Sequence, residues 1–133
     1  MLILVETAED VAILRIASRD LTLHDQHIFT RTLETFLSTH SNILLDMDEV
    51  QTVDGYTIAT LLRALNQLKQ RGGNLKLMNV HEPVLDFFEI ARVHRVFEFH
   101  RSLQEAMASF RHDGRSLHSE AMPIWQAVPG VAD

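Results

Sequence analysis

Two hydrophobic periods, one typical of strands and one typical of helices, alternate along the first 110 residues. Short runs of branched apolar residues at 2–5 and 11–16, with polar residues between them, predict a β-hairpin. From 24 to 40, apolar residues recur at every third or fourth position, which predicts an amphipathic helix. The continuous apolar run 43–45, which ends at Asp46, is typical of a central strand that is covered on both faces.

A strand–helix–strand unit follows from this central strand. Residues 57–71 carry apolar side chains on one face, which predicts a second helix. Gly72 and Gly73 then stand where a helix terminator in the left-handed conformation is expected. The alternating stretch 75–77 predicts the closing strand, which should lie parallel to the central strand through a right-handed crossover.

The remaining periodic part of the chain predicts two more helices and one more strand. Pro83 suits the first position of a short helix that reaches Ala91, and a short strand follows at 96–99. Ser102 and Glu105 have the spacing of a capping box, so we expect a last helix from there to Phe110. This order predicts a single α/β domain, with a mixed sheet of about five strands and about four helices packed on it.

The hydrophobic pattern stops after Phe110. Glycines, prolines and scattered polar residues occupy 111–133, so we predict a folded domain at 1–110 and a mobile C-terminal tail at 111–133. Within that tail, Met122, Pro123, Ile124 and Trp125 form an apolar group that could dock on a partner. A tail that folds back or stays disordered is the simpler alternative.

Charge and composition narrow the classes of partner. The formal net charge is −6, with acidic and basic residues interspersed, so neither nucleic acid nor direct membrane insertion is expected. The chain has no cysteine, which excludes disulfides, thiolate nucleophiles and cysteine-based metal sites. The apolar run at 1–5 is too short for a signal peptide or a membrane span. We therefore expect a cytoplasmic protein.

An acidic loop joins the central strand to the second helix, and reads Leu45-Asp46-Met47-Asp48-Glu49-Val50-Gln51-Thr52-Val53-Asp54-Gly55-Tyr56-Thr57. It resembles the STAS family, the sulfate-transporter and anti-sigma-factor-antagonist domain, whose signature is a strand ending in Asp, a short loop and Asp-Ser-x-Gly at a helix start. The resemblance spans about 2–110 and is supported by 73–80 and 102–106. It implies a non-enzymatic, protein-binding regulator that is similar to anti-sigma-factor antagonists in bacterial partner-switching signal transduction.

The chain departs from the family pattern at the phosphorylated position. Asp54 aligns with the family's aspartate, Gly55 with the phosphoacceptor serine and Thr57 with the later glycine. Gly55 has no hydroxyl, so we expect no phosphorylation at the usual site. Thr57 is a candidate substitute acceptor, with Thr52 and Thr60 as alternatives, although threonines at a helix start usually cap or pack. The chain is then either a constitutive binder or a fixed subunit.

The resemblance implies that this loop and helix start bind the protein partner. The partner would be an anti-sigma factor serine kinase or a phosphatase, and a homodimer is also possible. The alternative is a STAS adaptor subunit of a transporter or signalling assembly. Asp54 also has a structural interpretation as a helix N-cap, and Tyr56 offers a large contact area. The predicted partner-binding residues are Asp48, Glu49, Thr52, Asp54, Gly55, Tyr56 and Thr57.

Other chemistries have weaker support in the sequence. His24 and His27, with Asp25 between them, lack a third ligand at short spacing. The acidic residues of the loop lack the spacing of a calcium-binding loop, and Gly72 and Gly73 end a helix instead of opening a phosphate-binding one. No catalytic serine motif is present. We therefore expect no metal site, no cofactor and no catalytic residues.

Overall fold

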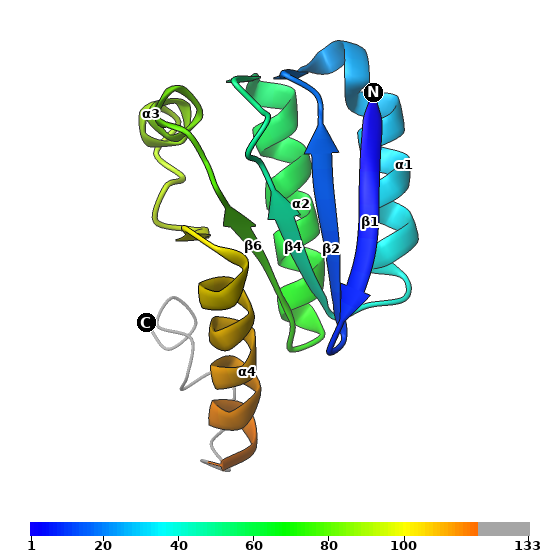
Figure 1. Cartoon of the computed structure of the whole chain (residues 1–133), viewed down its shortest axis with the longest axis vertical. Coiled ribbons are helices and arrows are strands. Elements are labelled where there is room, and N and C mark those ends of the chain that lie inside the picture. The colour runs from blue at the N-terminus through cyan, green and yellow to red at the C-terminus, as the bar shows by residue number, and fades with distance from the viewer. Residues whose placement is uncertain (120–133) are drawn as a thin grey trace.

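The structure is a computed structural model that describes residues 1–119. Five strands form one mixed sheet in the order β1-β2-β4-β6-β7 (Figure 1). β1 is antiparallel to β2, and the other neighbours are parallel, so the predicted hairpin and parallel unit are confirmed. The strands are β1 (Leu2–Ala8), β2 (Val11–Ala17), β4 (Asn42–Asp46), β6 (Asn74–Met78) and β7 (Glu98–His100).

The turn between β1 and β2 holds the hairpin in register. Glu9 and Asp10 both have positive φ, at 50° and 69°, and Ala8 pairs with Val11 across them. Two-residue turns with positive φ at both positions have a backbone twist that matches the twist of the flanking strands. The pairing then continues without interruption to Leu2 and Ala17.

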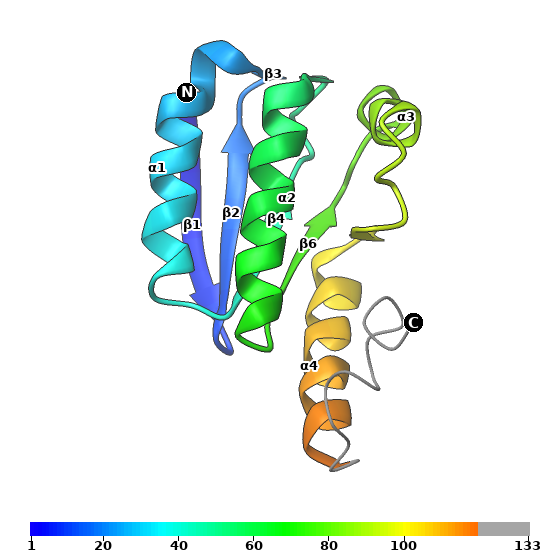
Figure 2. The same ribbon diagram turned by 180° about the vertical axis from the view of Figure 1, so that it is seen from behind.

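Two helices cover one face of the sheet. Figure 2 shows α1 (Gln26–Leu37) and α2 (Gly55–Gln70) in front of β1, β2 and β4. Their apolar faces bury Phe29, Leu33, Leu61 and Leu65 against the strands. α3 (Glu82–Ile90) lies beyond the carboxyl end of β6 and adds Phe88 to the same core.

The end of α2 is set by two glycines. Gly72 has a φ of 82°, which confirms the predicted left-handed terminator. A Cβ on Gly73 would lie 1.6 Å from the backbone oxygen of Ser41, so only glycine allows the chain to pass there. The four predicted helices and the mixed sheet of five strands are thus all present.

α4 (Leu103–Ser119) packs on the opposite face of the sheet and is longer than predicted. Ser102 accepts a hydrogen bond from Glu105 N, while the Glu105 carboxylate accepts from Arg101 N. The predicted helix end at Phe110 is wrong, because the helix continues through Gly114 to Ser119. Residues 120–133, which include the apolar group Met122–Trp125, lie outside the described residues.

Polar contacts hold the part of α4 beyond Phe110. Asp113 contacts Lys76 of β6 at 2.6 Å, and Arg111 contacts Glu9 at 2.8 Å. Both pairs join residues far apart in the sequence, which a periodic apolar pattern does not reveal. The packed part of the chain therefore includes residues that the sequence assigned to the tail.

Three short elements were not predicted. β3 (Asp20–Leu21) and β5 (Thr52–Val53) form a separate two-stranded parallel sheet, and a 3-10 helix follows at Leu23–Asp25. The last strand begins at Glu98, two residues after its predicted start. Among the helices of residues 1–119, none has the length and apolar content needed to cross a membrane.

Candidate functional site

Asp54 joins the start of α2 to the segment that follows β3. Its carboxylate accepts a hydrogen bond from Thr57 N at 3.1 Å, which confirms its interpretation as the helix N-cap. The same carboxylate accepts from Leu23 N at 2.7 Å. One side chain therefore fixes two segments that lie 31 residues apart.

Thr57 and Thr60 are buried beneath this junction. The Thr57 hydroxyl is fully buried, donates to the carbonyl oxygen of Leu21 at 2.8 Å and accepts from Gln26 Nε2 at 2.9 Å. Thr60 is 6% exposed and lies 2.9 Å from Gln26 Oε1. A kinase cannot reach a hydroxyl so enclosed, so Thr57 and Thr60 are poor substitute acceptors in this conformation. Of the three candidate threonines, only Thr52 is exposed.

Gly55 and Tyr56 face solvent on top of this buried junction. Nothing lies within 4 Å of the position that a Cβ on Gly55 would occupy. Tyr56 is 61% exposed, and Leu23, which is tied to Asp54, is 52% exposed. Two large apolar side chains thus stand exposed on segments that Asp54 joins. An exposed tyrosine on a backbone held in this way is suited to anchor a protein partner.

The acidic loop before β5 is held by contacts to β2 and β4 and to the segment that joins β6 to α3. Glu49 pairs with Arg15 of β2 at 3.0 Å. His81 Nε2 lies 2.7 Å from the carbonyl oxygen of Asp48 and 3.3 Å from its carboxylate. Asp46 accepts hydrogen bonds from Asp48 N and from Asn79 Nδ2. The loop therefore presents its exposed carboxylates, Asp48 and Glu49, in a defined arrangement.

The seven predicted partner-binding residues divide into two groups. Asp48, Glu49, Thr52, Gly55 and Tyr56 are exposed near the carboxyl ends of the parallel strands, where α2 begins. Asp54 is half-buried and Thr57 is buried, so these two support the surface from beneath. Leu23, Gln26 and His81 were missed. No periodic signal marks them, and their contacts depend on tertiary structure.

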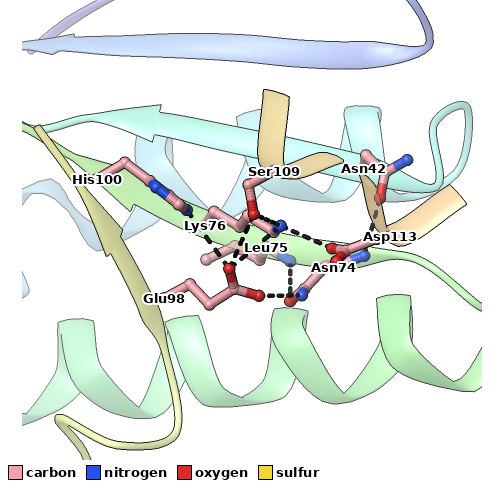
Figure 3. A network of polar contacts seen from close by, with 8 residues as sticks. All are labelled: Asn42, Asn74, Leu75, Lys76, Glu98, His100, Ser109 and Asp113. Carbon is pink, nitrogen blue, oxygen red and sulfur yellow. Dashed lines mark hydrogen bonds and ion pairs between the residues drawn. The ribbon is translucent and has the colours of Figure 1, made fainter. Parts of the chain in front are cut away.

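A second polar cluster lies between β6, β7 and α4 (Figure 3). Lys76 is fully buried, and its Nζ lies 2.6 Å from Asp113, 3.3 Å from Glu98 and 4.5 Å from the centre of the Phe110 ring. His100 Nε2 lies 3.4 Å from Glu98 without hydrogen-bond geometry. This cluster attaches α4 to the sheet.

The charge on Glu98 depends on this cluster. Burial by itself would raise the pKa of Glu98, but the Lys76 ammonium, hydrogen bonds from Ser109 and Lys76, and nearby His100 together lower it below its ordinary value. Glu98 is therefore held as a carboxylate beside the buried ammonium.

The described residues offer no arrangement suited to metal chemistry. Across residues 1–119, no group of three or more histidine, aspartate or glutamate side chains could hold a metal ion. His24 and His27, considered above as ligands, are both exposed, His24 in the 3-10 helix and His27 in the first turn of α1.

The described residues form an α/β domain in which the start of α2 is exposed. A sequence comparison then identifies the family, because the family described as "STAS domain" matches residues 3–106. The chain therefore belongs to the STAS domain family, as its acidic loop and helix start had indicated.

Individual relatives agree with this assignment. A Thermotoga maritima protein, provisionally named an anti-sigma factor antagonist, is 23% identical over 105 residues, which are 77% of this chain and 92% of that protein. The anti-sigma factor antagonist SpoIIAA of Bacillus, in its unphosphorylated form, has the same fold, with a TM-score of 0.71 at 15% identity. That match covers 84% of this chain and 97% of SpoIIAA.

A second similar structure is the murine anion transporter Slc26a9, with a TM-score of 0.63 and 21% identity. The match covers 80% of this chain but 18% of the transporter. The same fold therefore occurs in a small antagonist and as a part of a much larger membrane protein. At these identities, the structural matches show the fold alone.

Proposed function

We propose that the chain is a non-enzymatic regulator that acts in the cytoplasm and resembles an anti-sigma-factor antagonist in bacterial partner switching. The observation that carries this proposal is the rigid, exposed start of α2. Gly55 and Tyr56 are exposed there, while Asp54 and Thr57 fix the backbone beneath them. The partner would be an anti-sigma factor serine kinase or a phosphatase.

Gly55 determines whether partner binding can be regulated by phosphorylation at the usual position. A phosphate on a serine adds about −1.5 to −2 charge at an interface and can release a partner. Gly55 cannot accept one, and the hydroxyls of Thr57 and Thr60 are enclosed. Of the three candidate threonines only Thr52 is exposed. A chain that is unmodified at Thr52 would therefore remain in a state equivalent to the unphosphorylated antagonist, and would bind its partner constitutively.

The experiment begins with affinity capture of the tagged chain from its native host, followed by mass spectrometry of co-purified proteins and of phosphate on the bait. The captured kinase or phosphatase is then titrated by calorimetry with wild type and with Gly55→Glu. The added carboxylate projects into open space, so the fold should persist while affinity falls about tenfold or more, which is about 1.4 kcal/mol.

A matched control separates a local effect from a general charge effect. Gln67→Glu adds the same charge to the exposed face of α2, away from its start, and should leave the affinity unchanged. If Gly55→Glu binds as tightly as wild type, then the helix start is not the contact surface and the proposal is wrong.

The similarity to a part of an anion transporter supports a second candidate function, a STAS adaptor subunit of a transporter or signalling assembly. This alternative also needs no phosphorylation switch. It predicts that the capture experiment recovers transporter subunits with an unmodified bait, and neither a kinase nor a phosphatase.

A further inference from the structure

The two edges of the five-stranded sheet differ in their protection. β7, at one edge, has only three residues and carries the polar side chains of Glu98 and His100. β1, at the other edge, has seven residues and pairs with β2 without a bulge from Leu2 to Ala8. It contains neither proline nor lysine. Natural sheets protect their edges by short strands, bulges, prolines or charged side chains. Glu6 is the one charged residue of β1, so β1 is the less protected edge.

Apolar side chains line this edge on both faces of the strand. Leu2, Leu4 and Val5 are 57%, 46% and 44% exposed. Among the described residues, β2 is the only strand that pairs with β1. A further strand added here would satisfy the open backbone groups and cover these three side chains.

We propose that the added strand is β1 of a second copy of this chain, antiparallel to the first, with the two-fold axis at Val5. Val5 is the midpoint of Leu2–Ala8, so this register pairs all seven residues of both strands. Val5 then lies opposite the partner's Val5, and Ile3 lies opposite the partner's Thr7. The interface is self-complementary, as a two-fold dimer requires.

Charge complementarity supports this register. Leu4 lies opposite Arg15 in the hairpin, so Leu4, Glu6 and Arg15 share one face of the sheet. In the dimer, Glu6 lies opposite the partner's Leu4 and in line with the partner's Arg15, two strands or about 10 Å away. These two long, oppositely charged side chains can meet across the intervening leucine, and the two-fold axis repeats the pair.

Both charged groups are accessible for this contact. The Arg15 side chain is 49% exposed, and that of its partner within the chain, Glu49, is 44% exposed. Glu6 is exposed and has no ion pair among the described residues. The exposed Arg15 side chain is therefore free to turn from Glu49 toward the partner's Glu6 in the dimer.

Neighbouring registers are less favourable. An axis at Leu4 would pair only residues 2–6 of β1 and would place Glu6 opposite the partner's Leu2, with Ala17 beyond it. An axis at Glu6 would place the two Glu6 carboxylates directly opposite each other, which is destabilising. The register centred on Val5 combines the longest pairing with opposite charges.

The test uses the full chain with its purification tag at the C-terminus, so that nothing is added next to β1. Sedimentation equilibrium should show a monomer–dimer equilibrium for wild type. Val5→Lys places two ammonium groups face to face on the axis, and should raise the dimer dissociation constant about tenfold or more. Ile90→Lys, at an apolar residue of α3 that is 80% exposed, is the matched control and should leave the equilibrium unchanged.

A charge exchange distinguishes the proposed register from general unfolding. Glu6→Arg alone should weaken the dimer, and the double variant Glu6→Arg with Arg15→Glu should restore it. Thermal unfolding confirms that each variant is folded. Hydrogen exchange should show protection of β1 amides that increases with protein concentration. These results would support the proposal, which does not depend on the proposed partner.

Two outcomes would overturn the proposal. A wild-type chain that stays monomeric over its whole soluble range would show that no second copy pairs with β1 and would leave this edge for a strand of another protein. A dimer that Val5→Lys does not weaken would show that the copies associate through a different surface.

Discussion

Lys76 shows how a single residue determines where α4 lies. Among the described residues, Lys76 is the only charged residue that is fully buried. The side chains of its partners Glu98 and Asp113 are 46% and 41% exposed. A buried ammonium is costly unless it is paired and hydrogen-bonded. The partners come from β7 and α4, so the charge of Lys76 favours the conformation in which both elements are docked.

The lowered pKa of Glu98 predicts a specific acid sensitivity. The ordinary pKa of this carboxyl group is 4.5, and it is lower in the folded chain. The ionised carboxylate therefore stabilises the fold at pH values above 4.5, and this stabilisation is lost as the pH falls through the folded pKa. In Glu98→Gln, the unfolding free energy should therefore fall less steeply with acid below pH 4.5 than in wild type. Urea denaturation over a series of pH values measures this slope.

The control for the pH experiment is Glu89→Gln. Glu89 is exposed on α3 and forms no ion pair among the described residues, so this variant should keep the wild-type slope below pH 4.5. If the slopes of the Glu98 variant and wild type coincide, then the ion pair with Lys76 contributes nothing to acid stability.

At the scale of elements, the extension of α4 predicts a boundary of stability. A chain that ends at Phe110 loses the contacts Lys76–Asp113 and Arg111–Glu9, while a chain that ends at Ser119 keeps both. We expect the shorter chain to have an unfolding free energy lower by about 2 kcal/mol. This is less than the roughly 3–5 kcal/mol for a buried charge that loses its partner, because Glu98 remains beside Lys76. Urea denaturation of the two chains measures the difference.

Asp113→Asn in the full chain isolates the ion pair in this prediction. This substitution should account for most of the lost unfolding free energy. Arg111 and Glu9 are both about half exposed, and such surface ion pairs contribute little to stability. Equal stability of the chains ending at Phe110 and Ser119 would mean that the added helical turns do not support the domain.

Elements whose hydrophobic pattern extends over many residues were predicted well, and elements of only two or three residues were not. α2 was evident because it combines a continuous apolar face with the terminator Gly72. β3 and β5 each have two residues, which is too short for a period to appear. The end of α4 was misjudged because Lys76 and Asp113, 37 residues apart, hold it in place.

In the candidate site, too, contacts between residues close in the sequence could be predicted, and contacts between distant residues could not. The cap at Asp54 could be predicted because its contact to Thr57 is local, and local capping follows sequence rules. The contact of Asp54 with Leu23 joins residues 31 positions apart, so only the fold reveals it. Burial of the Thr57 hydroxyl was likewise beyond the sequence, because the covering segment comes from the β3–α1 region.

At the scale of the whole molecule, the two proposed interfaces occupy different places. The partner-binding surface lies at the carboxyl ends of the parallel strands, where α2 begins (Figure 1). The proposed dimer interface is the outer edge of β1. A two-fold axis at Val5, perpendicular to the sheet, directs the carboxyl ends of the two protomers in opposite directions. Each protomer would therefore present its helix start at its own end of the assembly.

This geometry predicts that dimer formation and partner binding are independent. Val5→Lys should leave the affinity for the captured partner within about twofold of wild type, and Gly55→Glu should leave the dimer dissociation constant within the same limit, because neither substituted residue belongs to the other interface. Calorimetry measures the first quantity and sedimentation equilibrium the second. If bound partner instead changed the dimer dissociation constant, dimerisation would have to change the partner affinity by the same factor. The two surfaces would then be thermodynamically coupled, and dimerisation would act as a regulator of partner binding in a chain whose usual phosphorylation position is occupied by Gly55.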